Sequence, residues 1–248
     1  MAMRIASDSS RSRPWNHQPS RPPSSRVAAA GTPFALAHTF GQTGPFRPAN
    51  RTRTVPGLTL ESGEKLSGSR AIIRRLEELA PEPSLLPADP EERAAVARAE
   101  EWGDEVWQPM ARRLLWQTFT RHPQAMKSYQ AGSRYPLPGP AVRALAPMVN
   151  AVERRLNGAE EGAVRADLRS LPGHLDRIDA WLREGVIGGV DRLAADLQIA
   201  PTSRLMLTIG DVRPYFAGRP AEAHAMGLFG EWAGSTPPGV FPAEWLSA

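Results

Sequence analysis

A short hairpin followed at once by a helix, within residues 54–79, constrains the fold of this chain more than any other segment. An extended run over 57–61 meets a turn at Ser62-Gly63, and a second short strand follows at 65–66. A helix then begins at Ser69, with apolar residues at helical spacing behind it. Because the first N–H groups of a helix lack intrahelical partners and point outward, this junction predicts an anion-binding site.

The preceding segment, residues 1–50, has the composition of a disordered chain. Its seven prolines stand among serine, arginine and glycine, and only Phe34 to Phe40 is modestly apolar. No stretch of it alternates like a strand. We therefore predict a disordered or aberrant basic tail over 1–50.

The basic character of the chain belongs to this tail. Residues 1–60 hold eight arginines and one aspartate, whereas the remainder holds 22 basic and 25 acidic residues. The folded part is therefore mildly acidic, and a nucleic-acid partner is not expected for it. A weaker hypothesis makes the arginine-rich tail a tether to nucleic acid or to a membrane surface. No apolar run is long enough to span a membrane, and no apolar segment of the kind found in secretory signals follows the early arginine. The bias toward arginine and serine would suit an organellar transit peptide, but the prolines interrupt any amphipathic helix. We predict a cytoplasmic location.

Two residue types restrict the possible chemistry. Cysteine is absent, which excludes disulfides, thiolate metal sites and a cysteine nucleophile. The five histidines are scattered, with no pair at a metal-ligand spacing, so no metal site is predicted.

The rest of the chain reads as helical. Asp89 is a good N-cap for a long helix over 91–119, and Pro109 is expected to kink that helix. Further helices are predicted at 140–156, 160–184 and 193–208, and short turns over 209–248. The predicted fold class is α+β: a partial β-β-α unit over 51–80, a linker over 81–90 and an all-helical bundle over 91–248.

This order of elements resembles the glutathione S-transferase family, in which a thioredoxin-like domain precedes a helical domain. The similarity lies in VPGLTLESGEKLSGSRAI at 55–72, LEELAPEPSLLPADPEERAAVARAEEWGDEV at 76–106 and GVIGGVDRLAADLQIA at 185–200. The resemblance implies a partial thioredoxin-like unit, glutathione as co-substrate, a small electrophile as second substrate, and a homodimer.

The resemblance also implies roles for particular residues. Val55 would pair through its backbone with the cysteinyl part of glutathione, and Pro56 would be the cis proline that holds this backbone out. Ser69 would bind the γ-glutamyl carboxylate at the helix N-terminus. Gly68 stands where the family usually has an acidic residue that contacts the glutathione amine. Alternatively, a cis proline and a serine cap are structural features of any thioredoxin-like fold.

The residue that would activate the glutathione thiol is not identified. In the family it is Tyr, Ser or Cys after a first strand, and here the three tyrosines, at 129, 135 and 215, all fall in the helical part. We therefore expect either a transferase impaired in catalysis or a non-catalytic scaffold or dimerisation module. A reading-frame or start-site error and a degenerate family member are two explanations for the unrecognisable first part.

A helix start within the third segment departs from the family pattern in two ways. Leu193 stands three residues before Asp196, where the family usually has a small hydroxyl or amide cap, and losing that cap costs about 1 kcal/mol. Pro201 falls inside the same predicted helix and is expected to bend it.

Overall fold

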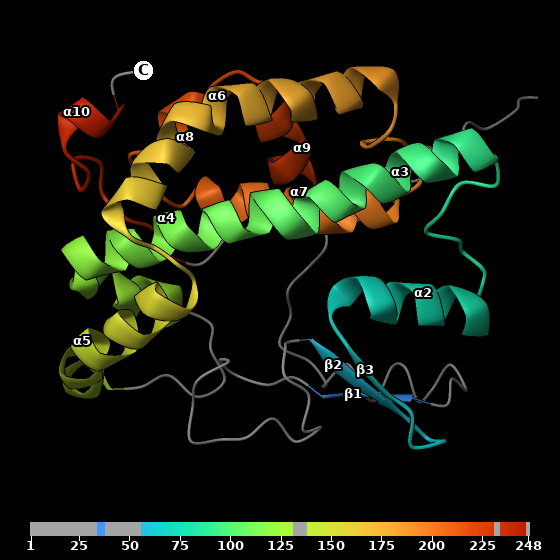
Figure 1. Ribbon diagram of the computed structural model, residues 1–248, viewed down its shortest axis with the longest axis horizontal. Coiled ribbons are helices and arrows are strands. Elements are labelled where there is room, and N and C mark those ends of the chain that lie inside the picture. The colour runs from blue at the N-terminus through green and yellow to red at the C-terminus, as the bar shows by residue number, and fades with distance from the viewer. Residues whose placement is uncertain (1–33, 38–55, 131–137, 231–233, 247–248) are drawn as a thin grey trace, which may run out of the picture. The chain divides into compact units, whose positions relative to one another are not determined.

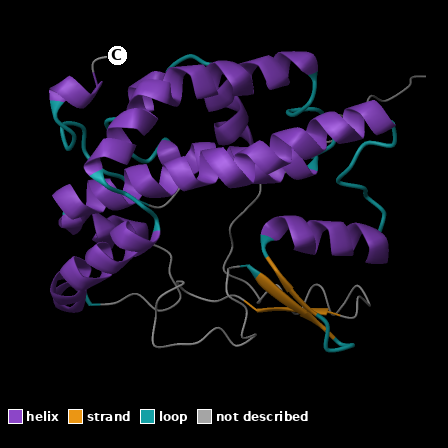
Figure 2. Cartoon of the chain, in the orientation of Figure 1, coloured by secondary structure: helices purple, strands orange, loops and turns teal. Residues whose placement is uncertain are grey.

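The computed structural model describes residues 34–37, 56–130, 138–230 and 234–246, the first of these ranges as backbone only. The chain divides into two compact units, Met1–Ser69 and Arg70–Ala248. The first carries a small antiparallel sheet and the second is helical (Figures 1 and 2). The predicted α+β class, a partial thioredoxin-like unit followed by an all-helical region, is confirmed.

The sheet has the strand order β1-β2-β3, with β1 at Phe34–Ala37, β2 at Gly57–Leu60 and β3 at Lys65–Ser67. The hairpin predicted between the last two strands is present, with Gly57 opposite Ser67. Its turn depends on Gly63, whose φ of 87° lies in the region that glycine adopts without strain.

The expectation that no strand lies within residues 1–50 is wrong at Phe34–Ala37. These four residues pair antiparallel with β2, Phe34 opposite Leu60 and Ala37 opposite Gly57. A four-residue strand is too short to reveal its alternation in the sequence, and it exists through its ladder with β2 rather than through local propensity. The rest of the predicted tail lies outside the described residues.

Helix α2 (Ser69–Leu79) follows the hairpin, and a long helical rod begins at α3 (Pro90–Trp102). As predicted, Asp89 caps α3: its Oδ1 accepts hydrogen bonds from the N–H groups of Glu91 and Glu92, each at 2.9 Å. This cap and the proline after it fix where the helix starts.

A π-helical turn interrupts this long helix just before Pro109. The turn, η1 (Gly103–Trp107), separates α3 from α4 (Gln108–Arg121), and the N–H of Gln108 donates to the carbonyl of Gly103. Pro109, which lacks an N–H, sits at the first turn after η1, so the wider turn absorbs the break for which a kink was predicted. A side chain at Gly103 would meet Cγ of Gln198 at 2.8 Å, so glycine there allows α7 to approach closely.

The remaining predicted helices are confirmed as α5 (Gly139–Leu156), α6 (Glu161–Glu184) and α7 (Ala194–Met206). Helix α7 includes Pro201 and contacts α3, α4 and α9 (Figure 1). The prediction of short turns after 208 is wrong at α9 (Pro220–Phe229), whose apolar composition gives no amphipathic period by which to recognise a helix. Shorter helical segments are η2 (Pro123–Gln130), α8 (Arg213–Phe216) and α10 (Ala243–Leu246).

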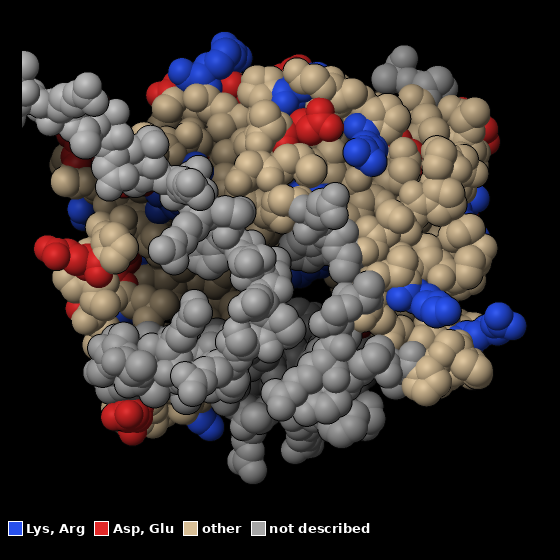
Figure 3. Space-filling model, turned by 180° about the vertical axis from the view of Figure 1, so that it is seen from behind, with Lys and Arg blue, Asp and Glu red and all other residues tan. Residues whose placement is uncertain are grey.

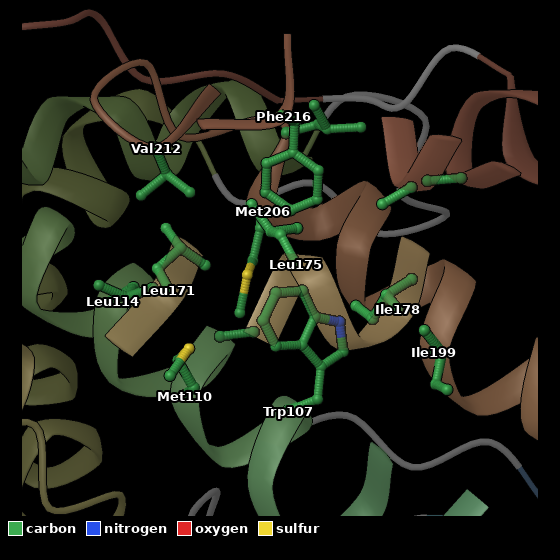
Figure 4. Packing of buried hydrophobic residues seen from close by; sticks show 14 of the residues in the cluster. Trp107, Met110, Leu114, Leu171, Leu175, Ile178, Ile199, Met206, Val212 and Phe216 are labelled. Carbon is green, nitrogen blue, oxygen red and sulfur yellow. The ribbon is translucent and has the colours of Figure 1, made fainter. Parts of the chain in front are cut away.

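The helical unit has one main hydrophobic core. Side chains from η1, α4, α6, α7 and α8 point toward one another in it (Figure 4). Trp107 is fully buried at its centre, and its indole N–H donates to the Ser203 hydroxyl at 3.0 Å. An indole buried with its N–H satisfied fixes the register of η1 on α7.

Charge is spread over the helical part. On the face shown in Figure 3, basic and acidic side chains lie scattered among uncharged surface. Among the described residues, none of the helices combines the length and the apolar character that crossing a membrane requires.

Candidate functional site

Three of the four predicted glutathione-site residues lie together at one end of the hairpin. The register that pairs Gly57 with Ser67 continues by one step, since the N–H of Gly68 donates to the carbonyl of Pro56 at 2.9 Å. Ser69 follows directly as the first residue of α2. The geometry therefore brings Pro56 beside the N-terminus of the helix. Val55 lies outside the described residues.

Gly68 takes a backbone conformation that explains its departure from the family pattern. Its φ is +90°, in the left-handed region, and the space around its missing side chain is open. An acidic residue there would find room but would strain the backbone by about 1 kcal/mol or more. The tight junction between strand and helix thus uses a glycine in place of the family's carboxylate.

The start of α2 has the electrostatics of an anion site. Ser69 is half-buried, and no acidic residue stands in the first turn of the helix. The positive end of the helix dipole favours a carboxylate at this position. A hydroxyl on the first residue adds a donor of the kind that a carboxylate accepts.

The hydroxyl groups of the two described tyrosines, Tyr129 and Tyr215, form hydrogen bonds within the helical unit. The hydroxyl of Tyr129 lies 2.6 Å from that of Thr208, and burial raises the pKa of Tyr129 to about 12. The hydroxyl of Tyr215 donates to the carbonyl of Leu246 at 3.0 Å, and burial raises its pKa as well. Neither is suited to stabilise a thiolate. Tyr135 lies outside the described residues, and the thiol-activating residue stays unassigned.

Sequence reasoning missed a buried ion pair between α2 and α3. The carboxylate of Glu100 is completely buried and accepts a hydrogen bond from Arg74. Glu100 follows the apolar positions Val96 and Ala99 on the inward side of α3, and a carboxylate at a core position is rare unless paired. That mismatch with the apolar pattern was the available signal.

A second buried carboxylate organises the start of α7. Asp196 is fully buried and accepts hydrogen bonds from the N–H groups of Gly188 and Leu193 and from Nε2 of His224. No group of three or more histidine, aspartate or glutamate residues within the described ranges is arranged to hold a metal ion. The hydrogen bonds of Asp196 tie the start of α7 to the preceding loop and to α9.

The fold and this junction define a class of protein: a small sheet whose hairpin leads directly into a helix, followed by an all-helical region. A family model described as "Glutathione S-transferase, N-terminal domain" matches residues 29–84. That span contains all three strands, Pro56, Gly68 and Ser69. Residues 29–84 therefore match the N-terminal domain of the glutathione S-transferase family, and the helical region after them fits that family.

A search of curated proteins gives a short local match. A stretch of 32 residues is 76% identical to a phytoene dehydrogenase of Streptomyces griseus, covering 13% of this chain and 6% of that protein. The chain thus spans only a small fraction of this relative's length. No solved structure matches the chain significantly.

Proposed function

We propose that this protein is a glutathione S-transferase-like protein that binds glutathione as co-substrate and directs its thiol at a small electrophile. The observation that carries the proposal is the junction of Pro56, Gly68 and Ser69 inside the family match. A cytoplasmic location follows from the same family assignment.

Each site residue has a role in this proposal. The backbone of Val55 pairs with the cysteinyl part of glutathione, and Pro56 holds that backbone outward. The hydroxyl and N–H of Ser69 bind the γ-glutamyl carboxylate, assisted by the dipole of α2. Because Gly68 replaces the usual acidic residue, the glutathione amine lacks one charged partner. The binding free energy should therefore be less favourable than in family members with the acid, by the value of one charge-assisted hydrogen bond, about 1.5–3 kcal/mol.

A thermal unfolding scan with and without millimolar glutathione tests binding. A ligand at a hundred times its dissociation constant stabilises the folded state by about 2.7 kcal/mol, which raises the midpoint. Ser69→Ala should remove the shift, whereas Ser62→Ala, in the exposed hairpin turn, should keep it. An unchanged midpoint for the wild-type protein would refute the binding proposal. Turnover of an aryl halide then separates a transferase from a protein that only binds glutathione.

A second candidate function, a non-catalytic scaffold or dimerisation module, is favoured by the surface of α5. Four large apolar side chains recur along this helix at helical spacing and are exposed by 42%, 62%, 42% and 58%: Leu145, Met148, Val152 and Leu156. A continuous exposed apolar stripe is typical of an interaction surface, and a homodimer would cover it.

Sedimentation equilibrium tests this second candidate. The wild-type protein should sediment as a dimer, and Met148→Glu should sediment as a monomer because it places a charge in the middle of the stripe. Ala223→Glu, at an exposed position of α9, is the control and should remain dimeric. A wild-type monomer would exclude the dimerisation module.

A further inference from the structure

Helix α2 is attached to the helical bundle mainly by charged side chains. Ile72 is its one buried residue, whereas the main cluster of buried apolar residues draws its members from α3 onward. Glu77 adds a polar attachment near the end of the helix, since its carboxylate accepts hydrogen bonds from the Leu85 N–H at 2.6 Å and the Ser84 hydroxyl at 2.8 Å. With so little apolar burial, the position of α2 depends on its polar partners.

The strongest of these partners is Glu100. Its side chain is 0% exposed and accepts a hydrogen bond from Nη2 of Arg74, whose side chain is 36% exposed. Burial raises the pKa of Glu100, and the charge of Arg74 opposes that effect. Removing one member of such a pair leaves a buried group without compensation, so the helix that carries Arg74 is held firmly.

A weaker contact lies one turn earlier on the same side of α2. Arg70 lies 3.4 Å from a carboxylate oxygen of Glu101 and 3.7 Å from one of Glu105. All three side chains are substantially exposed, and such pairs contribute about 0–1 kcal/mol. The buried pair therefore dominates the attachment of the N-terminal half of α2, the half that begins with Ser69.

We propose that Glu100 is a positioning residue of the glutathione site: through Arg74 it fixes the helix whose first residue, Ser69, receives the carboxylate of the ligand. The inference rests on the proposed function, because it concerns the same site. A helix moves as a rigid body, so a shift at Arg74 is transmitted to Ser69. A misplacement of about 1 Å is enough to cost up to a hundredfold in a binding or catalytic geometry.

The test compares glutathione affinity in variants of two ion pairs. Glu100→Gln and Arg74→Met break the proposed attachment. Asp167→Asn is the matched control, because it breaks a pair with Arg113 between α6 and α4, at 2.7 and 2.8 Å, with side chains exposed by 9% and 24%. Dissociation constants are measured by calorimetry well below the melting temperature of each variant, so that every protein is folded.

We expect about tenfold weaker glutathione binding for Glu100→Gln and for Arg74→Met. The double variant, Glu100→Gln with Arg74→Met, should bind glutathione about as weakly as whichever single variant has the lower affinity, because the two residues act as one unit. Asp167→Asn should lower the melting temperature and leave affinity within about twofold of wild type. Amide hydrogen exchange in α2, measured without ligand, should accelerate in Glu100→Gln and stay at the wild-type rate in Asp167→Asn.

The possible failures are distinguishable. Wild-type protein that binds no glutathione overturns both the proposed function and this inference. Wild-type protein that binds, together with a Glu100→Gln variant that melts lower but binds equally well, overturns the positioning role alone. The same holds if Asp167→Asn weakens binding as much as Glu100→Gln.

Discussion

Replacing Asp196 by asparagine tests how much of the helical bundle depends on one buried carboxylate. Oδ1 of Asp196 accepts from the Gly188 N–H and from Nε2 of His224, each at 2.7 Å, and Oδ2 accepts from the Leu193 N–H at 2.9 Å. Burial alone would raise the pKa of Asp196, but these hydrogen bonds outweigh it and lower the pKa below its usual 3.8.

The magnitude follows from the number and type of these bonds. A hydrogen bond to a charged group contributes about 1.5–3 kcal/mol, and stranding a buried donor costs a further 1–3 kcal/mol or so. Asparagine keeps one acceptor oxygen, and its NH₂ must then face either the Leu193 N–H or the donors from Gly188 and His224. We expect a loss of about 3 kcal/mol for Asp196→Asn, and about 5 kcal/mol for Asp196→Ala, which strands all three donors.

Urea unfolding followed by tryptophan fluorescence measures this loss. The midpoint should fall with an unchanged slope, since the surface exposed on unfolding is the same. Asp191→Asn is the control: its residue is exposed, and stability should change by no more than about 0.5 kcal/mol. Because the folded-state pKa of Asp196 is depressed, its contribution is present above pH 3.8 and is lost as pH falls below that value. A loss under about 1 kcal/mol for Asp196→Asn would refute this reasoning.

Three further outcomes are expected. Gly162→Ala, in α6 with open space around it, should stabilise the bundle by about 0.5–1 kcal/mol in urea unfolding, whereas Gly185→Ala, at φ +75° after α6, should destabilise it by about 1 kcal/mol. Burial lowers the pKa of His174, so the stability of the folded protein should fall as the pH drops below the usual pKa of 6.5. In melting curves His174→Gln should reduce this fall, and an equal fall in the variant would contradict the assignment to His174. Burial raises the pKa of Tyr129 to about 12, so the wild-type protein should lose stability between pH 10 and 12, and a similar loss in Tyr129→Phe would point to another group.

Local signals in the sequence predicted the helices well. Asp89 followed by proline determined the start of α3, and Gly185, with its positive φ, determined the end of α6. Both act on the backbone within a few residues, so they can be read without knowing the fold. The hairpin was predictable for the same reason, since Ser62-Gly63 supplies a turn that only glycine makes easily.

Features that depend on distant partners could not be predicted. Strand β1 exists because Phe34–Ala37 pairs with β2, and nothing within four residues identifies that partner. The π-helical turn lies where Gly103 approaches Gln198 on α7, a contact between segments far apart in the chain. Likewise, the sequence near Glu100 shows only a charged residue on an apolar helix face, and its role becomes clear from the ion pair with Arg74 on α2.

The start of α7 combines a local rule with a tertiary one. The cap predicted to be missing is indeed missing: Leu193 occupies the N-cap position, and its side chain makes no capping hydrogen bond. Leu193 is, however, partly buried against the hydrophobic core. Burial of about 40 Å² of apolar surface is enough to offset the cost of about 1 kcal/mol for the lost cap. Asp196 supplies the other half of the capping arrangement by accepting from the Leu193 N–H, and extends it to His224 on α9. The helix start has thus exchanged a local cap for contacts with the core, which ties its stability to the packing of the whole bundle.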